Sequence, residues 1–117
     1  MKPGNLKLTI YQGATFVLPM TWRQTGGLPY DLVGCTARMQ VRERVDAPDV
    51  LLELTTENGG IVLQAGSPNI VLQMSPAQTA ALAWRAGVYD LEVAFPNGYV
   101  RRLLERQVVV SPEVTRD

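Results

Sequence analysis

Short segments in which apolar and polar residues alternate follow one another along the chain. A period of two is typical of strands that bury one face. The clearest case is residues 35–44, where Cys35, Ala37, Met39 and Val41 share one face. Gly, Pro and Asn residues separate the segments at short intervals, as they do in all-β proteins. The pattern predicts strands at about residues 6–10, 15–23, 35–44, 50–55, 61–64, 70–74, 88–95 and 99–110.

Two of these segments carry an irregularity. Pro19 interrupts residues 15–23, and because proline cannot donate to a strand ladder, we expect either an edge strand there or a strand that is broken at Pro19. In residues 99–110 the alternation changes phase, and a β-bulge near Glu105 and Arg106 would restore it.

One short helix is expected before the last two strands. Ser75 is a favourable N-cap, Pro76 suits the first helical position, and Gln78 completes a capping box. Strong helix formers continue to Trp84, with Leu82 as the expected contact to the core. The predicted helix therefore covers about residues 76–84.

These elements predict one domain over residues 1–117 that ends in a polar C-terminal tail at residues 111–117, outside the sheet. Seven or eight strands with one short helix are typical of an all-β, immunoglobulin-like antiparallel β-sandwich. A small barrel is the alternative. The chain lacks the βαβ spacing of a parallel α/β fold.

Composition narrows the chemistry. The chain has no histidine, which excludes Ser–His triads and nearly all zinc sites, and Cys35 is its single cysteine. No phosphate-binding glycine loop or calcium loop occurs. We therefore predict that the protein is not an enzyme and has no catalytic residue, no cofactor and no metal site, with Cys35 as a buried, unreactive thiol.

Charge gives no reason to expect nucleic acid or a membrane as partner, because 11 basic residues balance 11 acidic ones. Arginines nevertheless gather in two predicted strands, Arg38, Arg42 and Arg44 in one and Arg101, Arg102 and Arg106 in the other. They could form an anion-binding surface, pair across strands with Asp90 and Glu92, or contact another protein. Overall neutrality favours internal pairing.

Apolar residues also occur at strand positions that the alternation assigns to the outward, polar face: Val17, Pro19, Leu51, Val62, Val71, Leu103 and Val109. A sandwich of this size has little second core to cover them, and contiguous exposure would mark a protein–protein surface. Our candidate interface residues are Val17, Pro19, Arg38, Arg42, Arg101, Arg102 and Trp84.

Several stretches carry a likeness to a known group of proteins: Gln12-Gly13-Ala14-Thr15-Phe16 and residues 21–23, 30–42, 51–55, 60–61, 89–93 and 103–105. With them the chain resembles small virion proteins of tailed bacteriophages, in particular the N-terminal β-sandwich of upper-baseplate and tail-fibre-attachment proteins. The resemblance carries over no site residue.

The resemblance implies a non-enzymatic subunit of the tail, baseplate or neck that is made in the host cytoplasm and located in the virion. Its partners would be other virion proteins, in a symmetric homo-oligomer or in several copies per particle. A head decoration protein is one alternative. The other is a stand-alone carbohydrate-binding module with a pocket lined by Trp84 or Tyr30.

Overall fold

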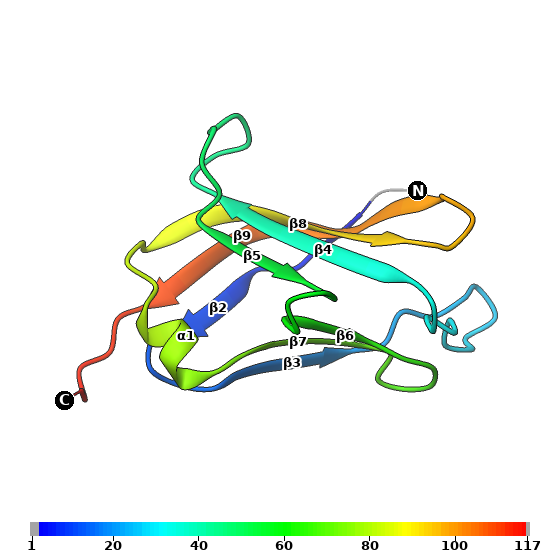
Figure 1. Cartoon of the computed structure of the whole chain (residues 1–117), viewed down its shortest axis with the longest axis horizontal. Coiled ribbons are helices and arrows are strands. Elements are labelled where there is room, and N and C mark those ends of the chain that lie inside the picture. The colour runs from blue at the N-terminus through cyan, green and yellow to red at the C-terminus, as the bar shows by residue number, and fades with distance from the viewer. Residues whose placement is uncertain (1–2, 117) are drawn as a thin grey trace.

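The computed structural model describes residues 3–116 and forms two packed sheets with one short helix (Figure 1). Its described strands are β1 (Gly4–Asn5), β2 (Leu8–Tyr11), β3 (Phe16–Met20), β4 (Thr36–Arg42), β5 (Leu52–Thr55), β6 (Ile61–Leu63), β7 (Ile70–Met74), β8 (Ala86–Ala94) and β9 (Val100–Ser111). The helix, α1, spans Pro76–Ala80.

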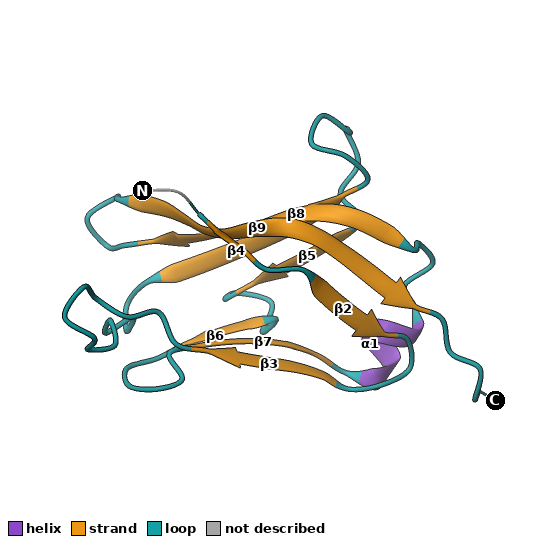
Figure 2. Ribbon diagram, turned by 180° about the vertical axis from the view of Figure 1, so that it is seen from behind, coloured by secondary structure: helices purple, strands orange, loops and turns teal. Residues whose placement is uncertain are grey.

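The large sheet has the order β1-β9-β8-β4-β5, with β2 also paired to β9, and the small sheet has the order β3-β7-β6. The two sheets lie face to face in Figure 2. Immunoglobulin domains likewise have the C, F and G strands in one sheet, as β4, β8 and β9 are here, and the B, E and D strands in the other, as β3, β7 and β6 are here. The predicted immunoglobulin-like β-sandwich is confirmed.

Some details of the prediction are wrong. The structure has nine strands in residues 3–116, rather than seven or eight, because the short strand β1 precedes the first predicted segment, which corresponds to β2. These two strands run parallel to β9, whereas the other pairings are antiparallel. The bulge lies at Leu103 and not at Glu105 and Arg106, since Leu91 pairs with Leu104 while Glu92 pairs with Arg102.

The helix begins as predicted but ends early. The Ser75 hydroxyl accepts a hydrogen bond from the Gln78 amide (3.2 Å), and the Gln78 side chain accepts one from the Ser75 amide (2.7 Å). Ala81 is the C-cap, so Trp84 lies outside the helix. The chain leaves the helix where Leu82 enters the core, with 7% of its surface exposed.

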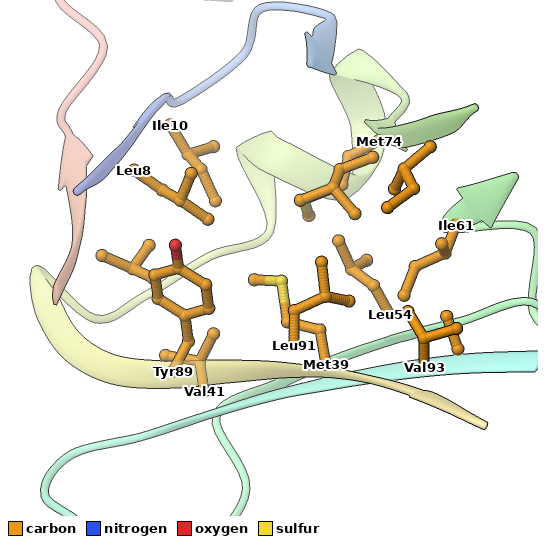
Figure 3. Close-up of a cluster of buried hydrophobic side chains, with 14 of the residues drawn as sticks. Leu8, Ile10, Met39, Val41, Leu54, Ile61, Met74, Tyr89, Leu91 and Val93 are labelled. Atoms are coloured by element: carbon orange, nitrogen blue, oxygen red, sulfur yellow. The ribbon is translucent and has the colours of Figure 1, made fainter. Parts of the chain in front are cut away.

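The core lies between the sheets (Figure 3). The predicted inward row of β4 is confirmed for Ala37, Met39 and Val41, which are at most 3% exposed, whereas Cys35 precedes the strand and is half-buried. Side chains from the small sheet complete the core, among them Ile61, Ile70, Leu72 and Met74. The small sheet ends at β3, so the expectation of an edge strand at Pro19 is confirmed.

Gln12 joins three distant segments at one end of the sandwich. Its Nε2 donates to the Leu82 carbonyl (3.0 Å), and its Oε1 accepts from the Glu113 amide (3.0 Å). The next residue, Gly13, has a φ of +84° and donates its amide to the buried Thr79 hydroxyl (3.0 Å). The Gln12-Gly13 pair, which is part of the resemblance, therefore holds these segments together by hydrogen bonds, and we call it the clip.

The clip and β9 also change where the C-terminal tail begins, compared with the prediction of residues 111–117. Ser111 belongs to the sheet, opposite Tyr11, and Glu113 is held by Gln12, so the tail outside the sheet begins at Pro112. Asp117 lies outside the described residues.

Candidate functional site

The seven candidate interface residues lie in four separate places. Val17 and Pro19 face outward from β3, and Arg38, Arg42 and Arg102 face outward from the large sheet. Arg101 lies against Trp22, and Trp84 follows the helix. The structure therefore offers two outer faces of different chemistry.

The outer face of the small sheet is uncharged and largely apolar, with the exposed Gln73 opposite Val17 as its polar member. Pro19 pairs with Val71, which also pairs with Val62, and Val17 lies two residues from Pro19 on the same face. Val17 is 56% exposed and Val62 is 37% exposed. We call these four residues the apolar stripe. None of the three strands contains an Asp, Glu, Lys or Arg residue, so no charge interrupts the stripe on these strands.

The outer face of the large sheet carries ion pairs. Arg38 Nε lies 2.9 Å from Glu53 Oε2, and Gln40 donates to the same oxygen (2.7 Å). The hydrogen bonds from Gln40 and then Arg38 hold the pKa of Glu53 below its usual value. Arg102 lies 3.7 Å from Asp90 and 3.4 Å from Glu105. These pairs are largely exposed, so water weakens them.

The expectation of internal pairing is thus confirmed for Arg38 and Arg102. The partner of Arg38 was not foreseen, because Glu53 reaches it from β5, whereas the sequence suggested an acid on β8. β5 and β8 flank β4 on opposite sides, and Arg38 lies level with Thr55 on one and Glu92 on the other.

Arg42 has no carboxylate partner among residues 3–116. One terminal guanidinium nitrogen donates to the carbonyls of Ala47 (2.9 Å) and Pro48 (3.0 Å), and the other donates to the Gln40 side chain (3.0 Å). Arg42 therefore anchors the loop that joins β4 to β5, which rises from the outer side of the large sheet in Figure 1.

A hollow of about 490 Å³ lies between this loop and β9. Its lining includes Gln40, Arg42, Val45, Asp90, Arg102 and Arg106. We call it the Arg42 hollow. It combines guanidinium groups, carboxylates and exposed apolar side chains on one concave surface.

Arg101 belongs to an aromatic cluster at the other end of the sandwich. Its guanidinium carbon lies 5.8 Å from the Trp22 ring centre, and Trp22 packs on Tyr30 (4.3 Å) and Phe95 (5.9 Å). The fully buried Asn69 fixes this cluster, because its side chain binds the Trp22 amide (2.8 Å) and the carbonyls of Trp22 (2.9 Å) and Tyr30 (3.0 Å). Sequence reasoning placed Asn69 in a turn and missed this role.

Trp84 and Cys35 are both half-buried. Trp84 packs against the core, as expected, and its indole nitrogen is buried without a hydrogen-bond partner. Neither Trp84 nor Tyr30 lines the Arg42 hollow. Burial, followed by the nearby charge of Asp31, raises the pKa of the Cys35 thiol, which lowers the fraction of reactive thiolate.

Residues 3–116 contain neither a metal-ion cluster nor a helix that could span a membrane. No cluster of three or more His, Cys, Asp or Glu side chains is arranged to hold a metal ion. No helix in this part of the chain has the length and hydropathy needed to cross a membrane.

No known protein family and no curated protein matches the sequence. Among solved structures, Tim-1 aligns over 100% of both chains with 15% identity and a TM-score of 0.44. The extracellular domain of the voltage-gated sodium channel beta4 subunit, described as a parallel homodimer with a role in cell–cell adhesion, aligns over 97% of both chains with 13% identity and a TM-score of 0.43. Likeness of this degree says nothing about what this chain binds.

Proposed function

We propose that the chain is a non-enzymatic structural or adaptor subunit of a tailed-phage particle that docks onto neighbouring virion proteins through the apolar stripe. The observation that carries the proposal is the uncharged small sheet, whose outer face presents the exposed Val17, Pro19 and Val62 around the half-buried Val71. The virion setting rests on the resemblance of residues such as Gln12 and Gly13 to phage baseplate domains.

Apolar contact is the binding mode that this surface favours. Complete burial of one exposed valine stabilises a complex by about 1.5–3 kcal/mol, so the stripe supplies a moderate affinity at each contact. In a symmetric particle the same contact recurs at every copy, and linked contacts strengthen one another. A single weak docking face is therefore sufficient for stable incorporation.

The test is mass spectrometry of purified particles from the phage or prophage that encodes the chain. We expect the protein in the particle, in a copy number that is a multiple of three, six or twelve. The variant Val17→Lys should fold but be absent from particles, because the charge would be buried against the neighbour. Val100→Lys is the matched control, since Val100 is 55% exposed and Val17 is 56% exposed.

Two results would contradict the proposal. Absence of the unaltered protein from purified particles would overturn the virion setting. Equal incorporation of Val17→Lys and Val100→Lys would show that the apolar stripe is not the docking face.

A further inference from the structure

The two sheets end in four strand edges, and three of these edges are obstructed. At β5, the Asn58 side chain accepts from the Thr55 amide (2.9 Å) and donates to the Glu53 carbonyl (3.0 Å), so it occupies groups that an added strand would bind. At β3, Pro19 lacks the N–H that a complete ladder needs. At β6, Ile61 is only 2% exposed, so its backbone is covered. The fourth edge, at β1 and β2 of the large sheet, has no such obstruction in the described part of the chain.

The outer edge of β2, which lies along β9 in Figure 2, carries unpaired backbone groups. Gln12 donates its amide to the Ser111 carbonyl of β9 (3.0 Å). Backbone groups of successive residues point to opposite sides of a strand, so the even-numbered residues of this segment bind β9, and the amides and carbonyls of Lys7, Thr9 and Tyr11 point to the open side. Within residues 3–116, the backbone amides and carbonyls of Lys7 and Thr9 make no hydrogen bond.

The side chains along this edge are also exposed. Lys7, Thr9 and Tyr11 face solvent from the outer side of the sheet, and Tyr11 is 62% exposed. Leu8 and Ile10, which lie between them, point into the core and are at most 2% exposed. The edge of β2 thus offers free backbone groups together with an ammonium group, a hydroxyl group and an aromatic ring.

We propose that the β2 edge pairs with the β2 edge of a second copy of this chain, antiparallel about a two-fold axis at Thr9. In this register Thr9 lies opposite the partner's Thr9, and Lys7 lies opposite the partner's Tyr11. The free amides and carbonyls of both copies then bind one another, and the two large sheets become one. The Tyr11 carbonyl already accepts from the Ala14 amide (3.1 Å) but keeps a second lone pair for this contact.

The edge is complementary to itself in this register. The ammonium group of each Lys7 lies against the ring of the opposite tyrosine, which is a favourable cation–π contact, and the two threonines form a favourable cross-strand pair. The two Lys7 residues are separated along the strands by the length from Lys7 to Tyr11, about 14 Å, so salt screens their repulsion. The two-fold axis repeats each contact, and these matched pairs select a second copy over an unrelated segment.

The contact is short, so the association is weak. A strand of four residues buries less area than the interfaces of stable dimers, and we expect a dissociation constant between about 10 μM and about 1 mM. Sedimentation equilibrium of the full chain across this range measures the constant. Monomer should predominate at the low end and dimer at the high end.

Variants of Tyr11 test the register. Tyr11→Lys places an ammonium group opposite the partner's Lys7 and should raise the dissociation constant by about tenfold or more. Tyr11→Glu is the matched control at the same exposed position, because it places a carboxylate there and should leave the dimer intact. Adding Lys7→Glu to Tyr11→Lys should restore dimerisation.

A variant of Thr9 tests the backbone pairing. Thr9→Pro removes an amide that points to the open side, so the bonds to β9 remain while the dimer is lost. Thr9→Val keeps this amide and should keep the dimer. Circular dichroism checks that each variant is folded, and the Tyr11 variants decide alone should Thr9→Pro not fold.

A chain that stays monomeric up to about 1 mM would overturn the inference. So would equal dissociation constants for Tyr11→Lys and Tyr11→Glu, or a dimer that persists in folded Thr9→Pro. Loss of the dimer in Val17→Lys would place the contact on the apolar stripe instead. The inference does not rest on the proposed function, since these measurements use the isolated chain, and its absence from particles would leave them unchanged.

Discussion

Asn69 offers a direct test of how the aromatic cluster is held in place. The side chain is fully buried and makes three hydrogen bonds, two to the backbone of Trp22 and one to the Tyr30 carbonyl. Asn69→Ala removes all three partners at once. It leaves the Trp22 amide and the Tyr30 carbonyl unpaired, whereas the Trp22 carbonyl still accepts a hydrogen bond from the Tyr30 amide (3.0 Å).

The expected cost follows from these groups. Each buried polar group left unpaired costs about 1–3 kcal/mol. Trp22 and Tyr30 are only half-buried, so water can reach the two freed groups in part, and we expect a loss near the low end of the sum, about 2 kcal/mol. For a chain of this size, 1 kcal/mol corresponds to a change in Tm of about 4 °C, so Tm should fall by about 8 °C.

Urea unfolding and thermal unfolding measure this loss, and tryptophan fluorescence reports on Trp22. Asn97→Ala is the matched control, because Asn97 is exposed and its side chain accepts one bond, from the Tyr99 amide (3.0 Å). That variant should lose about 1 kcal/mol or less. Asn69→Asp keeps the acceptor for the Trp22 amide but loses both donors, so it should remain strongly destabilised.

A loss of stability in Asn69→Ala no larger than that in Asn97→Ala would show that the buried hydrogen bonds of Asn69 do not hold the cluster. An Asn69→Asp variant as stable as the unaltered protein would show that the two donated bonds contribute nothing.

Three further predictions concern the clip, the core and one close backbone approach. Gln12→Ala should destabilise the fold by about 1–2 kcal/mol and speed hydrogen exchange at the Glu113 amide, as measured by NMR; unchanged exchange would contradict the clip. Burial raises the pKa of Tyr89 to about 12 from 10.0, so the folded state holds its proton more tightly, and stability should fall as pH rises from about 10 to about 12. An ultraviolet pH titration should show this late ionisation, and Tyr89→Phe should abolish it. Gly87→Ala should cost about 2 kcal/mol in urea unfolding, because its Cβ would lie 2.7 Å from the Arg42 carbonyl oxygen. Gly26→Ala meets nothing within 4 Å and should change stability by less than about 0.5 kcal/mol; equal costs would refute the argument.

Alternation along the chain predicted the fold well where burial itself produces the pattern. Met39, Val41 and Leu91 are inward because each strand of a sandwich has one face on the core. The position of the bulge could not be predicted, since an extra residue at Leu103 restores the phase as well as one at Glu105. The end of the helix was missed although Leu82 was expected in the core, because tertiary packing decides where the chain must leave the helix to bring Leu82 inward.

The candidate surfaces depended more strongly on pairing between distant strands. The sequence showed that Val17, Pro19, Val62 and Val71 occupy polar phases, but their contiguity follows from the order β3-β7-β6. The Arg42 hollow was not foreseen, because it needs the loop between β4 and β5 to lie near β9. Two of the candidate interface residues, Arg42 and Arg102, line it. Arg102 forms an ion pair with Asp90 of the neighbouring strand, whereas Arg42 donates to carbonyls of the loop, and neither arrangement can be read from the alternation of the sequence.

The parallel pairing of β2 with β9 has a consequence for how the chain folds during synthesis. Leu8 pairs with Val108, and Ile10 pairs with Val110, so β2 has no partner until about 100 more residues have been made. At about 5–20 residues per second, the ribosome needs roughly 5–20 s for that stretch. Throughout this interval Leu8 and Ile10, which are at most 2% exposed in the folded protein, face water. The strand that is made among the first is thus placed among the last, and folding of the large sheet is completed only after β9 leaves the ribosome.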